Sequence, residues 1–343
     1  RGADYVRLDA VGYMWKTPGT RCIHLEKTHQ LVKLFRAIAD QVAPGTVIIT
    51  ETNVPHQDNI SYLGNGHDEA QMVYQFSLPP LVLHAIHTGS ARALRQWASA
   101  LDLSSNDTTF FNFLASHDGI GLNPARGILS EVEIVALVRD LALEGALVSY
   151  KNNPDGTTSP YEINVTYMDA LNKQDDDDDT RIRRFMLAHA ILLAFPGVPA
   201  IYIQSILGSR NDVEGVRVAG HNRAINREKY ALSFIEKALS GADYLRQQIF
   251  NRLSALIQLR TRQAAFHPDN PMEILDSDNT LLMMRRHTPD GENNLLCVFN
   301  LSEKSVSAVL PEGKKYRDII EQKIIDGAQP VTLPPWHYLW LKG

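Results

Sequence analysis

The chain has 343 residues, of which 44% are hydrophobic and 21% charged, enough apolar sequence to bury one large domain and a smaller one. Its formal net charge of -5 argues against nucleic acid or an anionic membrane surface as a partner and favours a neutral small molecule. The apolar stretch 188–203 is interrupted by Pro196, Gly197 and Pro199, so it falls short of the ~20 apolar residues that a membrane span needs.

The cysteines and the start of the chain give three further expectations. Cys22 and Cys297 lie far apart, and no histidines stand at the spacing of a zinc site. We therefore expect no metal, no cofactor and a reduced, cytoplasmic setting. No pattern predicts an oligomeric state. The chain begins with Arg1 and shows no signal-peptide pattern, which suggests a fragment or a processed piece of a longer protein.

The first fifty residues predict a strand, a helix and a second strand. Residues 4–10 alternate, which places Arg7 and Asp9 on one face of a strand. Apolar residues recur at helical spacing over 24–42, and a β-branched run follows at 47–50. A helix between two strands forms a βαβ unit, which implies parallel neighbouring strands.

The same alternation continues along the chain. We expect further strands at 72–76, 110–115 and 198–204, and further helices at 90–99, 181–195 and 244–260. Each of the earlier strands ends in polar residues. This repetition predicts a partial TIM barrel, in which residues 1–118 carry the catalytic carboxylates and residues 181–263 form the end of the barrel.

Two regions depart from the barrel pattern. Between 119 and 180 the alternation loosens, and we interpret this region as an inserted subdomain over the barrel mouth. Over 264–343 the chain changes to short alternating runs, such as 280–286 and 295–301, separated by turn residues. This pattern predicts a small C-terminal antiparallel β domain beside the barrel. The expected fold class is therefore α/β.

Three acidic residues follow predicted strands, namely Asp9, Glu51 and Asp118. In TIM barrels the catalytic groups lie at the carboxyl ends of the strands. Adjacent strands lie ~4.8 Å apart, which would bring Asp9 and Glu51 near the ~5–5.5 Å separation of retaining glycosidases. We therefore expect Asp9 to be the nucleophile and Glu51 the acid/base.

The neighbours of these acids support different tasks for them. Arg7, two residues before Asp9, should hold that carboxylate ionised, whereas Glu51 must be protonated for part of the cycle. Asp118, with His117 beside it, is expected to bind sugar hydroxyls and to stabilise the transition state. Tyr13 either stacks on sugar at the mouth or packs under a loop.

Three segments resemble ordered motifs of the α-amylase superfamily, glycoside hydrolase family 13. They are Arg-Leu-Asp-Ala-Val-Gly-Tyr at 7–13, Glu51 after an apolar strand, and His-Asp-Gly-Ile-Gly at 117–121. Segments 76–84, 195–199 and 222–227 are similar to the sucrose phosphorylase branch of disaccharide phosphorylases. By this resemblance, Arg223 helps to shape the glucose subsite. The resemblance also implies that the chain lacks the N-terminal part of the barrel.

The resemblance implies a retaining α-glucoside phosphorylase. Such an enzyme transfers glucose from a small α-glucoside, such as sucrose, glucosylglycerate or glucosylglycerol, to inorganic phosphate. Tyr161 and Glu162 are expected to contact substrate, but Glu162 stands where sucrose-cleaving members carry glutamine. A carboxylate at the mouth would favour neutral acceptors unless a cation balances it. The alternatives are an α-glucosidase or transglucosidase, and a non-catalytic sugar-binding piece.

Overall fold

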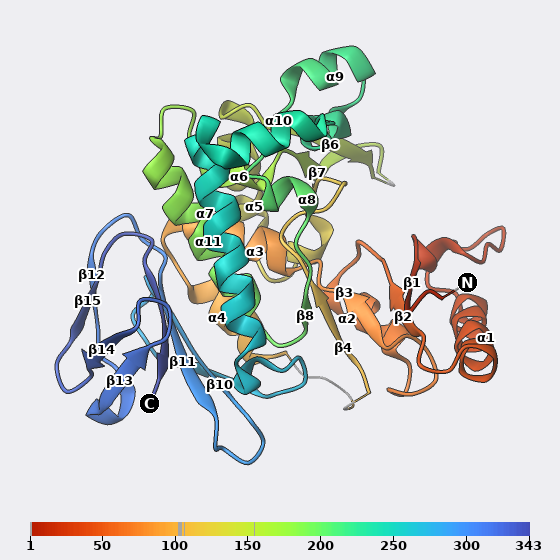
Figure 1. Cartoon of the computed structure of the whole chain (residues 1–343). Helices are drawn as coiled ribbons and strands as arrows, with labels where there is room; N and C mark the ends of the chain where they lie inside the picture. Colours follow the sequence, from red (N-terminus) through yellow and green to blue (C-terminus); the bar gives the residue numbers. More distant parts are fainter. Residues whose placement is uncertain (1, 102–104, 106, 154) are drawn as a thin grey trace.

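A parallel sheet of five strands forms the centre of the barrel region (Figure 1). The computed structural model describes residues 2–101, 105, 107–153 and 155–343. Its sheet order is β1-β2-β3-β4-β8, and all four pairings are parallel. The strands are β1 (Tyr5–Leu8), β2 (Val47–Thr50), β3 (Met72–Tyr74), β4 (Thr109–Asn112) and β8 (Val198–Pro199). This arrangement confirms the predicted partial TIM barrel.

Helices lie between these strands and after the last of them, and they contribute much of the core. They are α1 (Glu26–Val42), α2 (His56–Ile60), α3 (Leu78–Thr88), α4 (Arg92–Ser99), α7 (Asp178–Ala194), α8 (Ile203–Ile206), α9 (Val213–Ala219), α10 (Leu232–Lys237) and α11 (Tyr244–Thr261). Helix α3 and the C-terminal part of α7 are buried on nearly all sides, whereas α11 buries one face. In the described part of the chain, no helix has the length and apolar character that crossing a membrane requires.

Between β4 and α7 lies a small substructure of mixed elements. Its three-stranded sheet has the order β5-β7-β6, with β5 (Ile120–Gly121), β6 (Leu147–Asn152) and β7 (Thr158–Asn164). Helices α5 (Glu131–Leu143) and α6 (Tyr167–Leu171) accompany it. Ser130 and Glu133 form a capping box that fixes the start of α5. The sequence pattern had indicated an insertion here without predicting these elements.

The C-terminal region is an antiparallel β domain, as predicted. Its main sheet has the order β14-β13-β16-β11-β10-β9, and β12 pairs with β15. Inward side chains such as Leu282, Phe299 and Trp340 share one apolar cluster with α3, α7 and α11, so the domain packs directly on the barrel (Figure 1). The strands are β9 (Met272–Leu275), β10 (Leu281–His287), β11 (Asn294–Asn300), β12 (Val306–Ala308), β13 (Lys315–Asp318), β14 (Lys323–Asp326), β15 (Val331–Leu333) and β16 (Tyr338–Lys342).

The structure differs from the expected elements at β8 and at α3. The strand predicted over 198–204 contains only β8, because Pro199 cannot donate to the ladder and the chain then turns into α8. Helix α3 was not predicted, since Pro79 and Pro80 resemble helix breakers. Both prolines lie in the first turn of α3. Backbone N–H groups in a first turn make no intrahelical hydrogen bond, so a proline there removes none.

Candidate active site

The register of β1 and β2 brings Asp9 and Glu51 to the same edge of the sheet. Leu8 lies opposite Thr50, so the next residue on each strand is one of the two acids. The N–H of Glu51 donates to the carbonyl of Leu8 at 3.0 Å, and the N–H of Val11 donates to the carbonyl of Glu51 at 3.3 Å. The two carboxyl ends are thus held together by backbone hydrogen bonds, as parallel neighbouring strands require.

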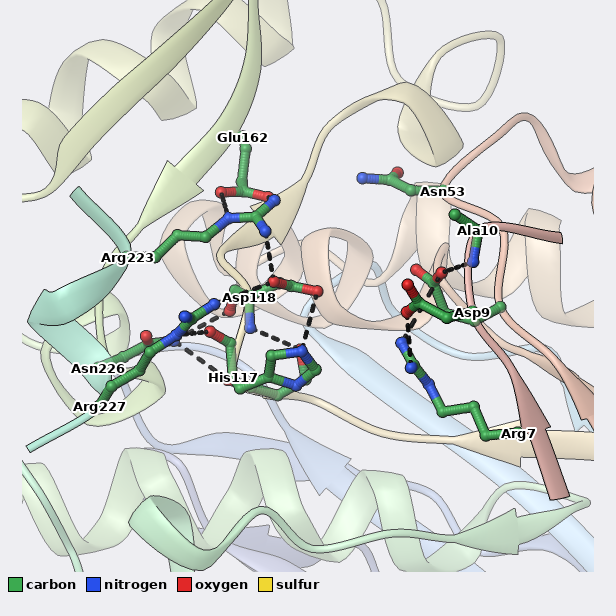
Figure 2. Close-up of polar contacts among 12 residues, drawn as sticks. Arg7, Asp9, Ala10, Asn53, His117, Asp118, Glu162, Arg223, Asn226 and Arg227 are labelled. Atoms are coloured by element: carbon green, nitrogen blue, oxygen red, sulfur yellow. Dashed lines mark hydrogen bonds and ion pairs between the residues drawn. The ribbon is translucent and has the colours of Figure 1, made fainter. Parts of the chain in front are cut away.

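Arg7 lies between the two carboxylates. Its Nη1 is 2.6 Å from Oδ1 of Asp9, and its Nη2 is 3.7 Å from Oε2 of Glu51. The guanidinium also lies 5.4 Å from the centre of the Tyr74 ring. The expected pairing of Arg7 with Asp9 is therefore present (Figure 2). The catalytic tasks assigned to these residues stay predictions.

Glu51 has the electrostatic environment of an acid/base. Burial raises the pKa of Glu51, and the charges of Asp9 and Asp118 raise it further, while the Ala10 N–H and Arg7 act in the opposite direction. The side chain of Glu51 is 12% exposed, against 72% for Asp9. A buried carboxyl with a raised pKa next to an exposed carboxyl is the pairing expected of a general acid beside a nucleophile.

A backbone contact at Ala10 was not predicted. Ala10 adopts the left-handed region, with φ 45° and ψ 39°. In this conformation its N–H donates to Oε2 of Glu51 at 2.9 Å. The residue that follows the candidate nucleophile therefore orients the candidate acid/base. No pattern of residue types signals a left-handed alanine, so sequence reasoning could not find this contact.

Asp118 lies in the loop after β4, at the centre of a charged cluster (Figure 2). Arg223 and Arg227 contact its Oδ1 at 2.6 Å and 3.2 Å, and Nε2 of His117 lies 3.6 Å from its Oδ2. Asn226 donates to the backbone carbonyl of Asp118 at 2.9 Å. Together these contacts fix the position of the Asp118 carboxylate.

Glu162, on β7, differs from what the sequence indicated. It is 2% exposed, and Arg223 contacts it with two hydrogen bonds, Nε to Oε1 at 3.0 Å and Nη2 to Oε2 at 2.7 Å. Glu162 is thus a buried partner of Arg223 and not an open carboxylate at the mouth. Because Arg223 balances its charge, the electrostatic argument for neutral acceptors no longer applies.

A cavity of about 700 Å³ adjoins Glu51. Tyr13 and Tyr161 line it together with Asn53, whose Nδ2 donates to the Tyr161 hydroxyl at 3.5 Å. Tyr13 is 51% exposed, which agrees with a position at the mouth and not with packing under a loop. The cavity therefore joins two of the predicted substrate-binding residues to the candidate acid/base.

Arg227 and Asn226 are site residues that sequence reasoning missed. Both belong to the short helix Asn222–Asn226 and its C-terminal end, in the same segment as Arg223. Both residues lie in segment 222–227, whose resemblance to the sucrose phosphorylase branch is the signal that could have identified them.

The chain is similar to several known proteins. Residues 272–340 match the family described as Maltogenic Amylase, C-terminal domain. The chain is 59% identical over 342 residues to a glucosylglycerate phosphorylase of Escherichia coli, covering 100% of this chain and 61% of the relative. It is 46% identical over 305 residues to the enzyme of that name in Allomeiothermus silvanus, with 88% and 54% covered. A sucrose phosphorylase of Agrobacterium vitis is 30% identical over 313 residues, with 88% and 59% covered.

Solved structures share the fold. The crystal structure of sucrose 6F-phosphate phosphorylase from Thermoanaerobacter thermosaccharolyticum superposes with a TM-score of 0.73 at 22% identity, covering 96% of this chain and 60% of that one. An α-amylase from H. orenii gives 0.64 at 15% identity, with 98% and 60% covered. The chain belongs to the α-amylase superfamily, in its sucrose phosphorylase-like branch of disaccharide phosphorylases. It spans 61% of the length of the Escherichia coli relative.

Proposed function

We propose that this chain supplies the catalytic edge of a retaining α-glucoside phosphorylase that acts on glucosylglycerate. The observation that carries the proposal is the pair of acids Asp9 and Glu51, held at one sheet edge with Arg7 between them. The relatives named as glucosylglycerate phosphorylases support the choice of substrate, since their identity to this chain exceeds that of the sucrose phosphorylases.

The first half-reaction forms a glucosyl-enzyme. The carboxylate of Asp9 attacks the anomeric carbon of the glucoside as the bond to the glycosidic oxygen breaks. Glu51 donates its proton to that oxygen, so glycerate leaves with the proton and Glu51 becomes a carboxylate. Because burial raises the pKa of Glu51, the side chain holds this proton to a higher pH than an exposed glutamate would.

The second half-reaction releases the product. Glu51 accepts a proton from inorganic phosphate as a phosphate oxygen attacks the anomeric carbon, and the bond to Asp9 breaks. Two inversions return the α configuration, giving α-glucose 1-phosphate. Asp118, fixed by Arg223 and Arg227, contributes by binding sugar hydroxyls more strongly as positive charge develops on the ring.

The test uses the full-length protein with glucosylglycerate and phosphate. Wild-type protein should release glucose 1-phosphate only when phosphate is present. Asp9→Asn should lower this rate on the order of 10⁴-fold or more, because the residue that forms the covalent bond is lost. Asp4→Asn, an exposed change just before β1, is the matched control and should keep wild-type activity.

Two outcomes would contradict the proposal. Release of free glucose at a rate independent of phosphate would identify a glucosidase instead. Tight binding of the glucoside by wild-type protein without any turnover would identify a sugar-binding protein.

A further inference from the structure

Two cations lie in the wall of the cavity that adjoins Glu51. Arg126 and Lys151 both belong to the substructure between β4 and α7, and both are half-buried. Nη2 of Arg126 donates to the carbonyl of Pro160 at 3.4 Å, which directs the guanidinium along β7. Glu51 lines the same cavity. The candidate acid/base therefore faces a space that also contains positive charge.

Lys151 has no acidic partner in the part of the chain that the structure describes. Its Nζ is 2.9 Å from Oδ1 of Asn123, a neutral acceptor. Among the described residues, no carboxylate oxygen lies within 4.0 Å of this ammonium group, whereas Arg126 pairs with Glu131. Burial lowers the pKa of Lys151, the positive charge of Arg126 lowers it further, and Glu131 raises it. A bound anion would offset the repulsion between the two cations.

The other charges around the cavity do not supply that anion. Arg21 and Asp58 are both exposed and have opposite signs, so their effects on the interior largely offset each other. Burial lowers the pKa of His24, which leaves its ring uncharged at neutral pH. Glu131 partly balances the charge of Arg126, so Lys151 is the half-buried cation of the cavity wall that has no carboxylate within 4.0 Å among the described residues.

In the proposed reaction, two different anions occupy the cavity next to Glu51 one after the other. Retention of configuration requires the leaving group and the incoming phosphate to occupy the same side of the anomeric carbon, next to Glu51. Glycerate carries a carboxylate, and phosphate carries one or two negative charges near neutral pH. A single cationic subsite can therefore serve both half-reactions.

We propose that Arg126 and Lys151 form an anion subsite that holds the glycerate carboxylate of the donor and then the attacking phosphate. This proposal rests on the proposed function. In this proposal the two cations of the cavity wall determine which acceptors bind. Their charge increases the affinity for anionic acceptors and does not increase the affinity for neutral acceptors or water.

The experiment loads the full-length protein with glucose from α-glucosyl fluoride, an uncharged donor. Transfer to glycerate, phosphate, glycerol and water is then measured separately. Lys151→Met should lower kcat/KM for glycerate and for phosphate by about 10- to 100-fold, because one charge of the subsite is removed. Transfer to glycerol and hydrolysis should change by less than about threefold, because neither acceptor carries charge.

Matched variants separate a charge effect from a structural one. Lys151→Arg keeps the positive charge and should restore most of the transfer to both anions. Lys315→Met removes an exposed lysine of the β domain and should leave all four rates unchanged. Arg126→Gln gives an independent test of the same subsite, should Lys151→Met fail to fold.

The results distinguish the two proposals. An equal loss for all four acceptors, or unchanged transfer to glycerate and phosphate, would overturn the anion subsite while leaving the phosphorylase in place. Wild-type protein that transfers glucose to water alone would overturn the proposed function and the subsite with it.

Discussion

Arg7 is a cation that contacts both candidate catalytic acids. It contacts Asp9 at 2.6 Å and Glu51 at 3.7 Å, and its charge lowers the pKa of Glu51 against the larger effect of burial. Arg7 therefore limits how far burial raises the pKa of Glu51, while it also pairs with Asp9.

Removing that charge should change the pH dependence of the reaction. In Arg7→Met the pKa of Glu51 rises, so the protonated acid persists to higher pH and the basic limb of kcat/KM for the donor moves upward. The rate also falls, because Asp9 loses its partner. Arg7→Lys keeps the charge and should leave the limb nearly in place. A basic limb that moves to lower pH in Arg7→Met would contradict this interpretation.

Some of the individual residues of the candidate site could be predicted from residue type and position. Asp9, Glu51 and Asp118 follow strands, and strand ends are where a barrel places its chemistry. The pairing of Glu162 with Arg223 could not be predicted, because it joins β7 to a helix about sixty residues later. The left-handed Ala10 is likewise a property of the folded backbone and not of the residue type.

The link between α7 and β8 constrains the position of the last barrel strand. Gly197 has φ 113°, and a Cβ there would lie 2.6 Å from the carbonyl oxygen of Phe110 and 2.7 Å from Nδ2 of Asn112. That Nδ2 donates to the carbonyl of Pro196 at 2.6 Å. The closeness of this glycine to β4 is what allows β8 to join the sheet.

Gly197→Ala should therefore destabilise the protein by about 3 kcal/mol or more, because backbone strain and two close contacts add. Gly127→Ala is the matched control: it also has positive φ, 82°, but no atom lies within 4 Å of the added Cβ. Gly127→Ala should lower the free energy of unfolding by about 1 kcal/mol, because only the backbone conformation is strained there. Denaturant unfolding of both variants measures the difference. Equal losses would show that the contacts to β4 relax freely.

Elements with a clear period were predictable, and elements that depend on tertiary contacts were not. Helices α1, α7 and α11 follow from apolar spacing in the sequence. The hairpin of β6 and β7 was not predicted, since its strands carry mostly polar residues and gain their partners across the substructure. For β8, pairing with β4 ends after two residues because of a proline.

Across the whole molecule, Arg286 joins the β domain to the barrel. It lies on β10, is 0% exposed, and donates to four backbone carbonyls. These belong to Ala194 at 2.6 Å, His267 at 2.8 Å, Asn270 at 3.1 Å and Pro271 at 3.2 Å. Burial lowers its pKa to about 9, so the guanidinium still carries its charge at neutral pH.

Arg286→Met should cost about 3 to 5 kcal/mol of stability, because four buried carbonyl groups lose their donor. The neighbouring Arg285→Met is the control. Arg285 points to the opposite face of β10 and pairs there with Glu273 and Glu312 near the surface, so its loss should cost at most about 1 kcal/mol. Calorimetric unfolding of both variants tests this. Similar losses would mean that water replaces the guanidinium at the interface.

The outer side of β1 has a consequence for how this chain behaves in solution. Within the described residues β1 pairs only with β2, and nearby α1 exposes Leu34 (51%), Ile38 (47%) and Val42 (75%). An unpaired strand edge beside an apolar helix surface is a template for association with other chains. Expressed by itself, residues 1–343 should form soluble oligomers or aggregates whose size grows with protein concentration.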